Sequence, residues 1–287
     1  MVVNGFNILD PEMMSIGTGL YLGVSIIDHS CDPNAVAVFT GTTIHIRALK
    51  RMDSLNWDNV RITYVELLNT AHERQEDLKS TYYFLCQCSK CVDHAELELQ
   101  RSMLCKCGSA VAIFQKEEYG KVCGACGVHI KPAQIDRFLE VSELTNQHLQ
   151  AMRAQDTAYL DVCKLCLEKQ ADMFHPMNLL RVKTLDFAFE SAVHMGSCAE
   201  ALRLGIELEP GYRRYYGEVH PLMGLLYLKL ARLTLFLSDK PSEAVDWLKR
   251  AQHILRITHG ERHPLWRDEV LPLVAQALGE THNGLGP

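Results

Sequence analysis

The spacing of the cysteines constrains this 287-residue chain more than any other feature. Seven of its eleven cysteines fall between residues 67 and 135, in one triplet and two pairs. The first residues lack the basic and apolar regions of a secretory signal, so we expect a protein of the cytoplasm and nucleus. Disulfide frameworks are rare in those reducing compartments. Tight cysteine groups therefore predict metal sites.

The triplet Cys86, Cys88 and Cys91 places three thiolates within six residues, close enough for one turn of chain to surround a single ion. Structural zinc prefers four tetrahedral ligands, so a fourth must come from elsewhere. The best remote donor is Cys31, which lies in the run Asp28–Asn34 (DHSCDPN). We predict a structural zinc held by these four cysteines. The alternative is a set of buried or free thiols.

A second set of four thiols forms two pairs, CKCG and CGACG, each followed by glycine. Paired knuckles of this kind, joined by 15 residues that can form a β-hairpin, predict a small zinc ribbon. Its ligands would be Cys105, Cys107, Cys123 and Cys126; the alternative is a partly degenerate ribbon with free thiols. The pair Cys163 and Cys166 lies in an apolar helical stretch without a partner pair, so we assign it to a helix core.

The residue composition and the apolar periodicity change along the chain and predict an α+β fold. Residues 1–66 contain three β-branched runs, the third at 60–64, and such runs favour short strands. The break at Gly41 between the first two runs predicts a hairpin. Residues 67–93 hold a helix near 70–83 and the cysteine triplet, and residues 94–135 hold the ribbon-like insert. Residues 136–287 show apolar positions at spacings of three and four, which is typical of stacked amphipathic helices.

The helical part repeats. His-Pro dipeptides begin at His175, His220 and His263, with spacings of 45 and 43 residues, and each precedes an apolar helix. The segments Ala199–Leu202 and Ser242–Val245 are also 43 residues apart. This periodicity predicts helix pairs of tetratricopeptide type, with chance similarity among helices as the alternative. Because the histidines occur once per repeat, we expect them to cap or pack against helices, not to bind metal.

Charge and hydropathy exclude some functions. A formal net charge of −6 argues against general binding to nucleic acid or to an anionic membrane. The chain has no apolar run of about 18 residues or more, so we expect no membrane span. Partners are expected to be proteins or peptides recognised by shape or local charge.

Three motifs, taken in order, resemble those of SET-domain methyltransferases. The run Asp28–Asn34 resembles the signature Asn-His-Ser-Cys-x-Pro-Asn, and Cys86–Cys91 resembles the zinc triplet that follows the SET domain. Tyr64 falls between them, where the catalytic tyrosine of the family belongs. Within SET proteins the likeness is to the SMYD (SET and MYND domain) family, because it continues through 185–188 and 256–260.

This resemblance implies a protein-lysine methyltransferase that uses S-adenosylmethionine and structural zinc and acts on a histone or another protein. It implies that Tyr64 is catalytic, that Phe6 and Tyr82 wall the lysine channel, and that the cofactor contacts are Asp28, His29 and Phe84. It also suggests chaperone C-termini or other peptides as ligands of the helical repeats. Taken singly, each aromatic residue would be ordinary core.

The sequence departs from the SMYD pattern in three places. Asp28 replaces the first asparagine of the signature, which exchanges an amide donor for a carboxylate acceptor. Residues 56–59 replace the usual Gly-Glu-Glu turn. The N-terminal SET strands, the glycine-rich cofactor loop and the MYND finger have no counterpart in this sequence. These departures keep open a second hypothesis, a non-catalytic, zinc-stabilised module that binds partner peptides through its helical repeats.

Overall fold

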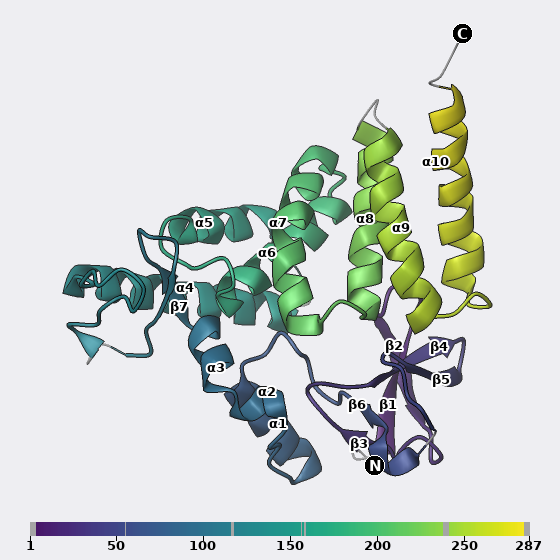
Figure 1. Cartoon of the computed structure of the whole chain (residues 1–287), viewed down its shortest axis with the longest axis horizontal. Helices are drawn as coiled ribbons and strands as arrows, with labels where there is room; N and C mark the ends of the chain where they lie inside the picture. The colour runs from purple at the N-terminus through teal and green to yellow at the C-terminus, as the bar shows by residue number, and fades with distance from the viewer. Residues whose placement is uncertain are drawn as a thin grey trace. The chain divides into compact units, whose positions relative to one another are not determined.

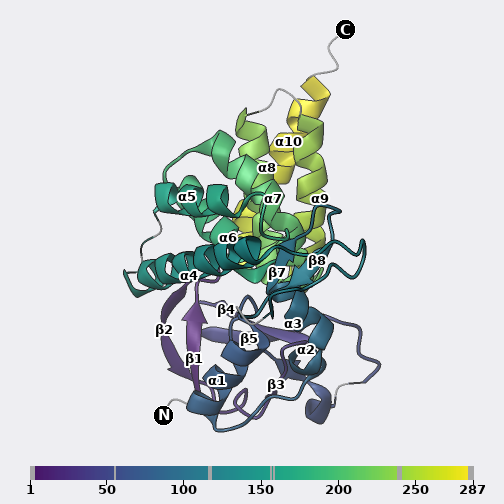
Figure 2. The same ribbon diagram turned by 90° about the vertical axis from the view of Figure 1, so that its left-hand side faces the viewer.

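The computed structural model describes residues 4–54, 56–115, 118–155, 157, 159–237 and 241–283. The chain divides into two compact units (Figures 1 and 2). The first unit joins Met1–Val92 to Tyr216–Pro287, and the second unit is the continuous segment Asp93–Tyr215. Strands and helices both occur, as the α+β prediction requires.

The strands of the first unit pair in twos. β1 (Gly5–Leu9) is antiparallel to β2 (Ser15–Leu20), β4 (Ala35–Thr40) is antiparallel to β5 (Thr43–Ala48), and β3 (Asp28–His29) is parallel to β6 (Arg61–Ile62). Gly41, with a φ of 58°, makes the turn between β4 and β5 and confirms the predicted hairpin.

The strand expected at 60–64 is shorter than predicted. Only Arg61–Ile62 pair, because Val60 terminates the short helix η2 (Trp57–Asn59) and the Thr63 hydroxyl donates to the Val65 carbonyl in a turn. The core beneath these strands contains Ile27, Ala35, Val60 and Ile62. Phe6 and Tyr64 pack against that core, so the core supports two of the predicted site residues.

Helix α1 (Ala71–Tyr82) forms where a helix was predicted. Thr70 accepts a hydrogen bond from the Glu73 backbone, and the Glu73 carboxylate accepts one from the Thr70 backbone, which completes a capping box. The helix ends at Tyr83, whose φ of 63° is left-handed. The turn delivers the chain directly to Phe84, the cysteine triplet and the short helix α2 (Ser89–Val92).

The first unit continues with α8 (Pro221–Leu237), α9 (Pro241–Thr258), η4 (Leu265–Val270) and α10 (Leu271–Asn283). Helices α8, α9 and α10 lie side by side in Figure 1. Gly224 permits the close crossing of α8 and α9, because a Cβ there would lie 2.6 Å from the Leu255 side chain.

The three His-Pro histidines share one contact. In His175, His220 and His263 the Nδ1 atom accepts a hydrogen bond of 3.2 Å from the backbone N–H two residues further on. For His220 and His263 the donor lies in the first turn of α8 and of η4, which confirms the capping role. For His175 the donor is Met177, in a turn before α6, and the N-cap of α6 is Asn178. His263 uses its other nitrogen as well, because Nε2 lies 2.8 Å from the Phe39 carbonyl of β4.

The buried histidines make the stability of the first unit sensitive to acid. Burial lowers the pKa of His259 to about 3, with His263 and Arg47 adding to the shift, and its Nε2 has no hydrogen-bond partner among the described residues. Below about pH 6.5 the unfolded chain binds a proton at this position and the folded chain does not, so stability falls as the pH falls. Between pH 7.5 and pH 5 this histidine should cost about 2 kcal/mol.

Urea unfolding at the two pH values, for the wild type and for His259→Asn, would measure this effect. The comparison cancels the acid sensitivity of the thiols, which both proteins share. We expect the variant to lose about 2 kcal/mol less than the wild type between pH 7.5 and pH 5. Equal losses in the two proteins would contradict the prediction.

The second unit is mostly helical. It comprises α3 (His94–Gln100), β7 (Ser102–Leu104), β8 (Ala110–Ala112), α4 (Pro132–Gln155), α5 (Leu160–Gln170), α6 (Leu179–His194) and α7 (Cys198–Tyr216), whose last residue belongs to the first unit. Cys163 and Cys166 are buried within α5, which confirms the helix-core assignment.

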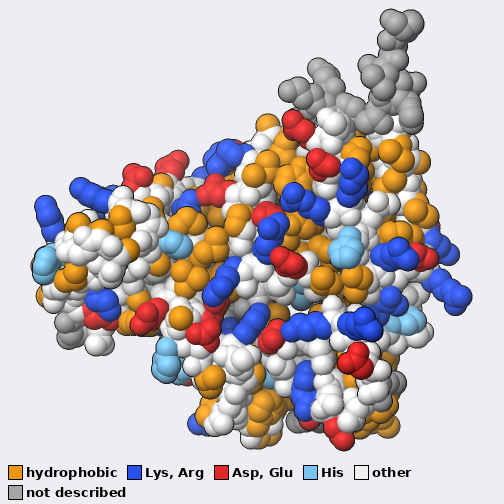
Figure 3. Space-filling model, viewed as in Figure 1, with side chains coloured by type: hydrophobic (Ala, Val, Ile, Leu, Met, Phe, Trp, Pro, Cys, Tyr) orange, Lys and Arg blue, Asp and Glu red, His pale blue; other side chains and the backbone are white. Residues whose placement is uncertain are grey.

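No described helix combines the length and the apolar character needed to cross a membrane. The face shown in Figure 3 carries basic and acidic side chains interspersed.

The ribbon-like insert differs from the expected hairpin. Strands β7 and β8 pair on either side of the first knuckle, and an isolated bridge between Val122 and His129 spans the second. The β-hairpin therefore encloses Cys105 and Cys107 instead of joining the two knuckles. Each knuckle is therefore held at its base by its own β pairing. Met103, Val111 and Phe174 belong to the core that packs behind the hairpin.

Candidate active site and metal centres

The run Asp28–Asn34 and the segment before Tyr64 interlock. The Ser30 N–H donates to the Ile62 carbonyl at 2.9 Å. The Asn34 side chain donates to the Asn59 carbonyl and accepts from the Arg61 N–H, both at 2.8 Å. An amide is suited to this position because it can donate and accept at once. These bonds bring the signature-like run against the segment that carries Tyr64.

Tyr64 is fixed at its backbone and at its hydroxyl. Its N–H donates to His29 Nδ1 at 3.0 Å, and its hydroxyl donates to the Ile27 carbonyl. Its ring centroid lies 4.8 Å from that of Tyr82 and 5.2 Å from that of His29. Burial, with Asp28 and Tyr82 contributing, raises the pKa of Tyr64 to about 12. The side chain is therefore a neutral phenol at physiological pH, a hydrogen-bonding group and not a base.

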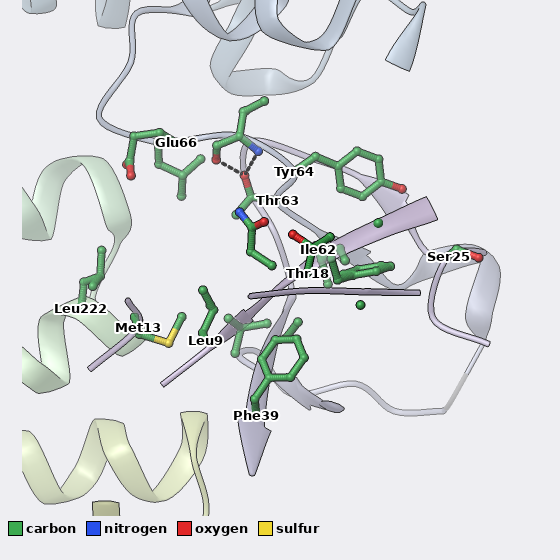
Figure 4. Close-up of a pocket in the computed structure, with 18 of the residues that line it drawn as sticks. Leu9, Met13, Thr18, Ser25, Phe39, Ile62, Thr63, Tyr64, Glu66 and Leu222 are labelled. Carbon is green, nitrogen blue, oxygen red and sulfur yellow. Dashed lines mark hydrogen bonds between the residues drawn. The ribbon is translucent and has the colours of Figure 1, made fainter. Parts of the chain in front are cut away.

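A pocket of about 830 Å³ opens beside Tyr64 within the first unit (Figure 4). The three aromatic residues predicted at the lysine site, Phe6, Tyr64 and Tyr82, all line it. In Figure 4, Tyr64 lies toward one end of the pocket, and Glu66 and Leu222 lie toward the other. The labelled residues at the Glu66 end include the apolar Leu9, Met13 and Leu222, so that end of the pocket carries one carboxylate among apolar side chains.

The residues predicted to contact a cofactor gather on another side of Tyr64. His29 has its ring centroid 6.0 Å from that of Phe84, and Asp28 is an exposed residue whose carboxylate lies 3.6 Å from Arg61. Asp28, His29 and Phe84 are not among the described residues that line the pocket. Both ring nitrogens of His29 are already engaged, Nδ1 by Tyr64 and Nε2 by Cys31, so only its backbone is available to a cofactor.

The structure brings Cys31, Cys86, Cys88 and Cys91, the first cysteine cluster, together. Their sulfur atoms lie within 4.8 Å of one another, and Cys31 and Cys91 are 3.5 Å apart. Tetrahedral zinc with bonds of ~2.3 Å requires sulfur atoms about 3.8 Å apart. The donor set and the spacing therefore fit structural zinc, although Cys31 precedes Tyr64 and lies 55 residues or more before the triplet.

Two donors surround the Cys31 sulfur. His29 Nδ1 accepts a hydrogen bond from Tyr64, so the ring proton is on Nε2, which lies 3.2 Å from Cys31 Sγ. Arg74 Nε also lies 3.2 Å from this sulfur. The Cys31 sulfur can thus accept from two N–H donors, and such contacts favour the thiolate form that binds metal.

Arg74 was not predicted as a site residue from the sequence. This arginine is 2% exposed and lies on the buried face of α1, which also carries Ala71 and Leu78. A charged residue three positions after one apolar residue and four before another was the available signal, because a buried cation requires a partner. The missing information was which anion would meet it.

The second cysteine cluster, Cys105, Cys107, Cys123 and Cys126, also converges to within 4.8 Å. Cys105 lies 3.7 Å from Cys126, and Cys107 lies 3.7 Å from Cys123, close to the separation in a tetrahedral zinc site. Cys105 and Cys123 are buried, whereas Cys107 and Cys126 are exposed. The cluster therefore fits a zinc ion at the surface of the second unit.

Comparison with known proteins gives several relatives, although no family model matches the chain. The chain is 28% identical to the histone-lysine N-methyltransferase SMYD3 of Homo sapiens over 95% of its own length and 56% of that protein. It is 30% identical to the histone-lysine N-methyltransferase ASHR1 of Arabidopsis thaliana over 92% of its length and 57% of that protein. A third relative is the N-lysine methyltransferase SMYD2-A of Danio rerio, at 27% identity over 93% and 57%.

The chain thus spans little more than half the length of these curated relatives. The match nevertheless runs through nearly all of this chain, including both the strand-rich part and the helices. It agrees with the resemblance of Asp28–Asn34, Tyr64 and the cysteine triplet to SET and MYND domain proteins, of which SMYD3 is one. These similarities support membership of the SMYD family.

Proposed function

We propose that the chain carries out S-adenosylmethionine-dependent methylation of lysine side chains in a histone or another protein. The observation that carries this proposal is the fixation of Tyr64, at both its backbone and its hydroxyl, in the wall of an aromatic pocket. The names of the relatives add support, because each is a lysine methyltransferase.

The proposed chemistry needs a neutral lysine amine held in line with a methyl group on sulfur, which the cofactor supplies when bound. Most of the rate increase in such a transfer comes from positioning and from exclusion of water. Phe6 and Tyr82 would wall the lysine side chain, and an apolar wall lowers the pKa of an amine and so favours its neutral form. The neutral Tyr64 hydroxyl would orient that amine without removing its proton.

The cofactor residues fit S-adenosylmethionine by their chemistry. Phe84 is 37% exposed and offers an aromatic face on which adenine can stack, and the exposed Asp28 offers a carboxylate to the amino group of the cofactor. Zinc in the first cluster would hold the cysteine triplet, and with it Phe84, against the Cys31 loop. Zinc in the second cluster would support the insert of the second unit.

The same family assignment supports a proposal for architecture. Residues 1–66 would correspond to the C-terminal part of a SET domain, 67–93 to its zinc region, and 136–287 to tetratricopeptide-like helices. The contact shared by the three histidines and the burial of Ala201 and Ala244 support the last assignment. We propose partner peptides, including chaperone C-termini, as ligands of those helices, and cytoplasm and nucleus as the location.

Calorimetric titration of S-adenosylmethionine into the zinc-loaded chain tests the proposal at its first step. We expect saturable binding near one to one, weakened in Phe84→Ala because the stacking surface is lost. Tyr159→Ala, which truncates an exposed aromatic of the second unit, should bind like the wild type. Absence of binding to a folded protein would contradict the proposal and favour the interaction-module hypothesis.

A further inference from the structure

One buried cation in the first unit has no carboxylate partner. Arg74 is 2% exposed, and no ion pair among the described residues joins it to aspartate or glutamate. Leaving a guanidinium unpaired in the protein interior is costly, so its counter-charge must come from another group. The groups within reach are sulfur atoms: Cys31 Sγ lies 3.2 Å from Arg74 Nε, and Cys91 Sγ lies 3.7 Å from Arg74 Nη2.

Arg74 also donates to two backbone carbonyls, one of which belongs to a further segment. One guanidinium nitrogen donates to Asn69, in the loop that follows Tyr64, and another lies 3.4 Å from the Lys90 carbonyl, inside the cysteine triplet. A planar guanidinium presents its five N–H groups in a fixed fork, which suits simultaneous contact with several acceptors. Arg74 thus meets the Cys31 loop, the Tyr64 loop and the triplet through a single side chain.

We propose that Arg74 is a positioning residue that stabilises zinc in the first cysteine cluster by offsetting the charge of its thiolates. Four thiolates around one divalent ion leave two negative charges, and a buried cation that donates to two of the sulfurs reduces that excess. The second cluster provides a contrast, because its donors are backbone N–H groups and Ser109, with no arginine or lysine hydrogen-bonded to it among the described residues. The inference rests on the proposed zinc sites and is independent of methyl transfer.

The test is competition for zinc between the loaded chain and a chromogenic chelator, with Arg74→Met as the variant. We expect the affinity of the first cluster to fall about 10- to 100-fold, as is typical when a group that hydrogen-bonds to a ligand is removed. The second cluster should retain its affinity. A Cys88→Ser chain, which lacks one ligand of the first cluster, identifies which step of zinc release belongs to that cluster.

Two further variants separate electrostatic positioning from general damage. Lys79→Met removes a cation from an exposed position of the same helix and should leave both affinities unchanged. Arg74→Lys keeps the charge but not the fork, so we expect an affinity between those of the wild type and Arg74→Met. Circular dichroism and cooperative urea unfolding report whether each variant is folded, and the zinc retained in the second cluster reports on the second unit.

An unchanged first-cluster affinity in folded Arg74→Met, or an equal loss at both clusters, would overturn the inference. If Arg74→Met fails to fold, the Arg74→Lys result decides: a selective loss at the first cluster supports the inference, and wild-type affinity overturns it. A wild-type chain that binds no zinc at the first cluster would instead overturn the proposed metal site. Methylation activity does not enter any of these outcomes.

Discussion

Replacing Tyr64 by phenylalanine is expected to lower methyl transfer by about a hundred- to a thousand-fold, the loss typical of removing one preorganised hydrogen-bonding group from a reacting centre. The ring would still pack against Tyr82 and His29, so the pocket wall would persist. The lost hydroxyl bond to Ile27 should cost only about 1 kcal/mol of stability. Cofactor affinity should change little, because Tyr64 is not among the residues assigned to the cofactor.

The measurement is single-turnover transfer of labelled methyl from S-adenosylmethionine to histone protein, with calorimetry for cofactor affinity. Tyr21→Phe is the matched control, because Tyr21 also donates its hydroxyl to a backbone carbonyl, that of Thr42 at 2.6 Å, and does not line the pocket. It should keep the wild-type rate. Equal rates for Tyr64→Phe and Tyr21→Phe would remove Tyr64 from the mechanism.

The second large effect is expected on cutting the first cysteine cluster. Cys88→Ser should release one zinc ion per chain and destroy cooperative unfolding of the first unit. Structural zinc contributes roughly 10–16 kcal/mol in small zinc domains, which is as large as the whole stability of a typical protein. Because the cluster holds Phe84 and the Cys31 loop together, S-adenosylmethionine binding should disappear with the metal.

Zinc content by mass spectrometry of the native protein, thermal unfolding and calorimetry measure the three consequences. Cys107→Ser, in the second cluster, should release the other zinc ion and leave cofactor binding intact. Cys198→Ser, which changes a thiol outside both clusters, should release none. Retention of cofactor binding by zinc-depleted Cys88→Ser would show that the cluster does not shape the site.

The cysteine clusters could be predicted because metal ligation imposes short spacings that remain visible in a linear sequence. The capping histidines were accessible for a similar reason: a His-Pro dipeptide repeated before apolar helices marks helix starts. Helix α1 was equally accessible through its Thr70 and Glu73 signals. In each case the signal lies within a few neighbouring residues, although the contacts that complete the clusters reach further, since Cys31 lies 55 residues before Cys86.

Arg74 and the ribbon pairing could not be predicted in the same way. The partners of Arg74 include Cys31, 43 residues away, and nothing local indicates which loop will meet the helix. The length of the linker between the two knuckles suits a hairpin, but the residues beside each knuckle pair around it instead, and Met103 and Val111 pack in a core with Phe138 and Phe174. The ring contacts of His29 could not be predicted because an imidazole can bind a metal, a cofactor or a backbone group, and the sequence does not show which.

The discontinuity of the first unit bears on how the chain folds during synthesis. Its hairpin contacts helices made much later: the Arg47 Nε donates to the Ile257 carbonyl across 210 residues, and His263 reaches Phe39 across 224. Such distant contacts form slowly, because a long loop must close before they form. The second unit is continuous and would emerge complete from the ribosome first, so the strands that carry Tyr64 would wait for their helical partners until translation is nearly finished.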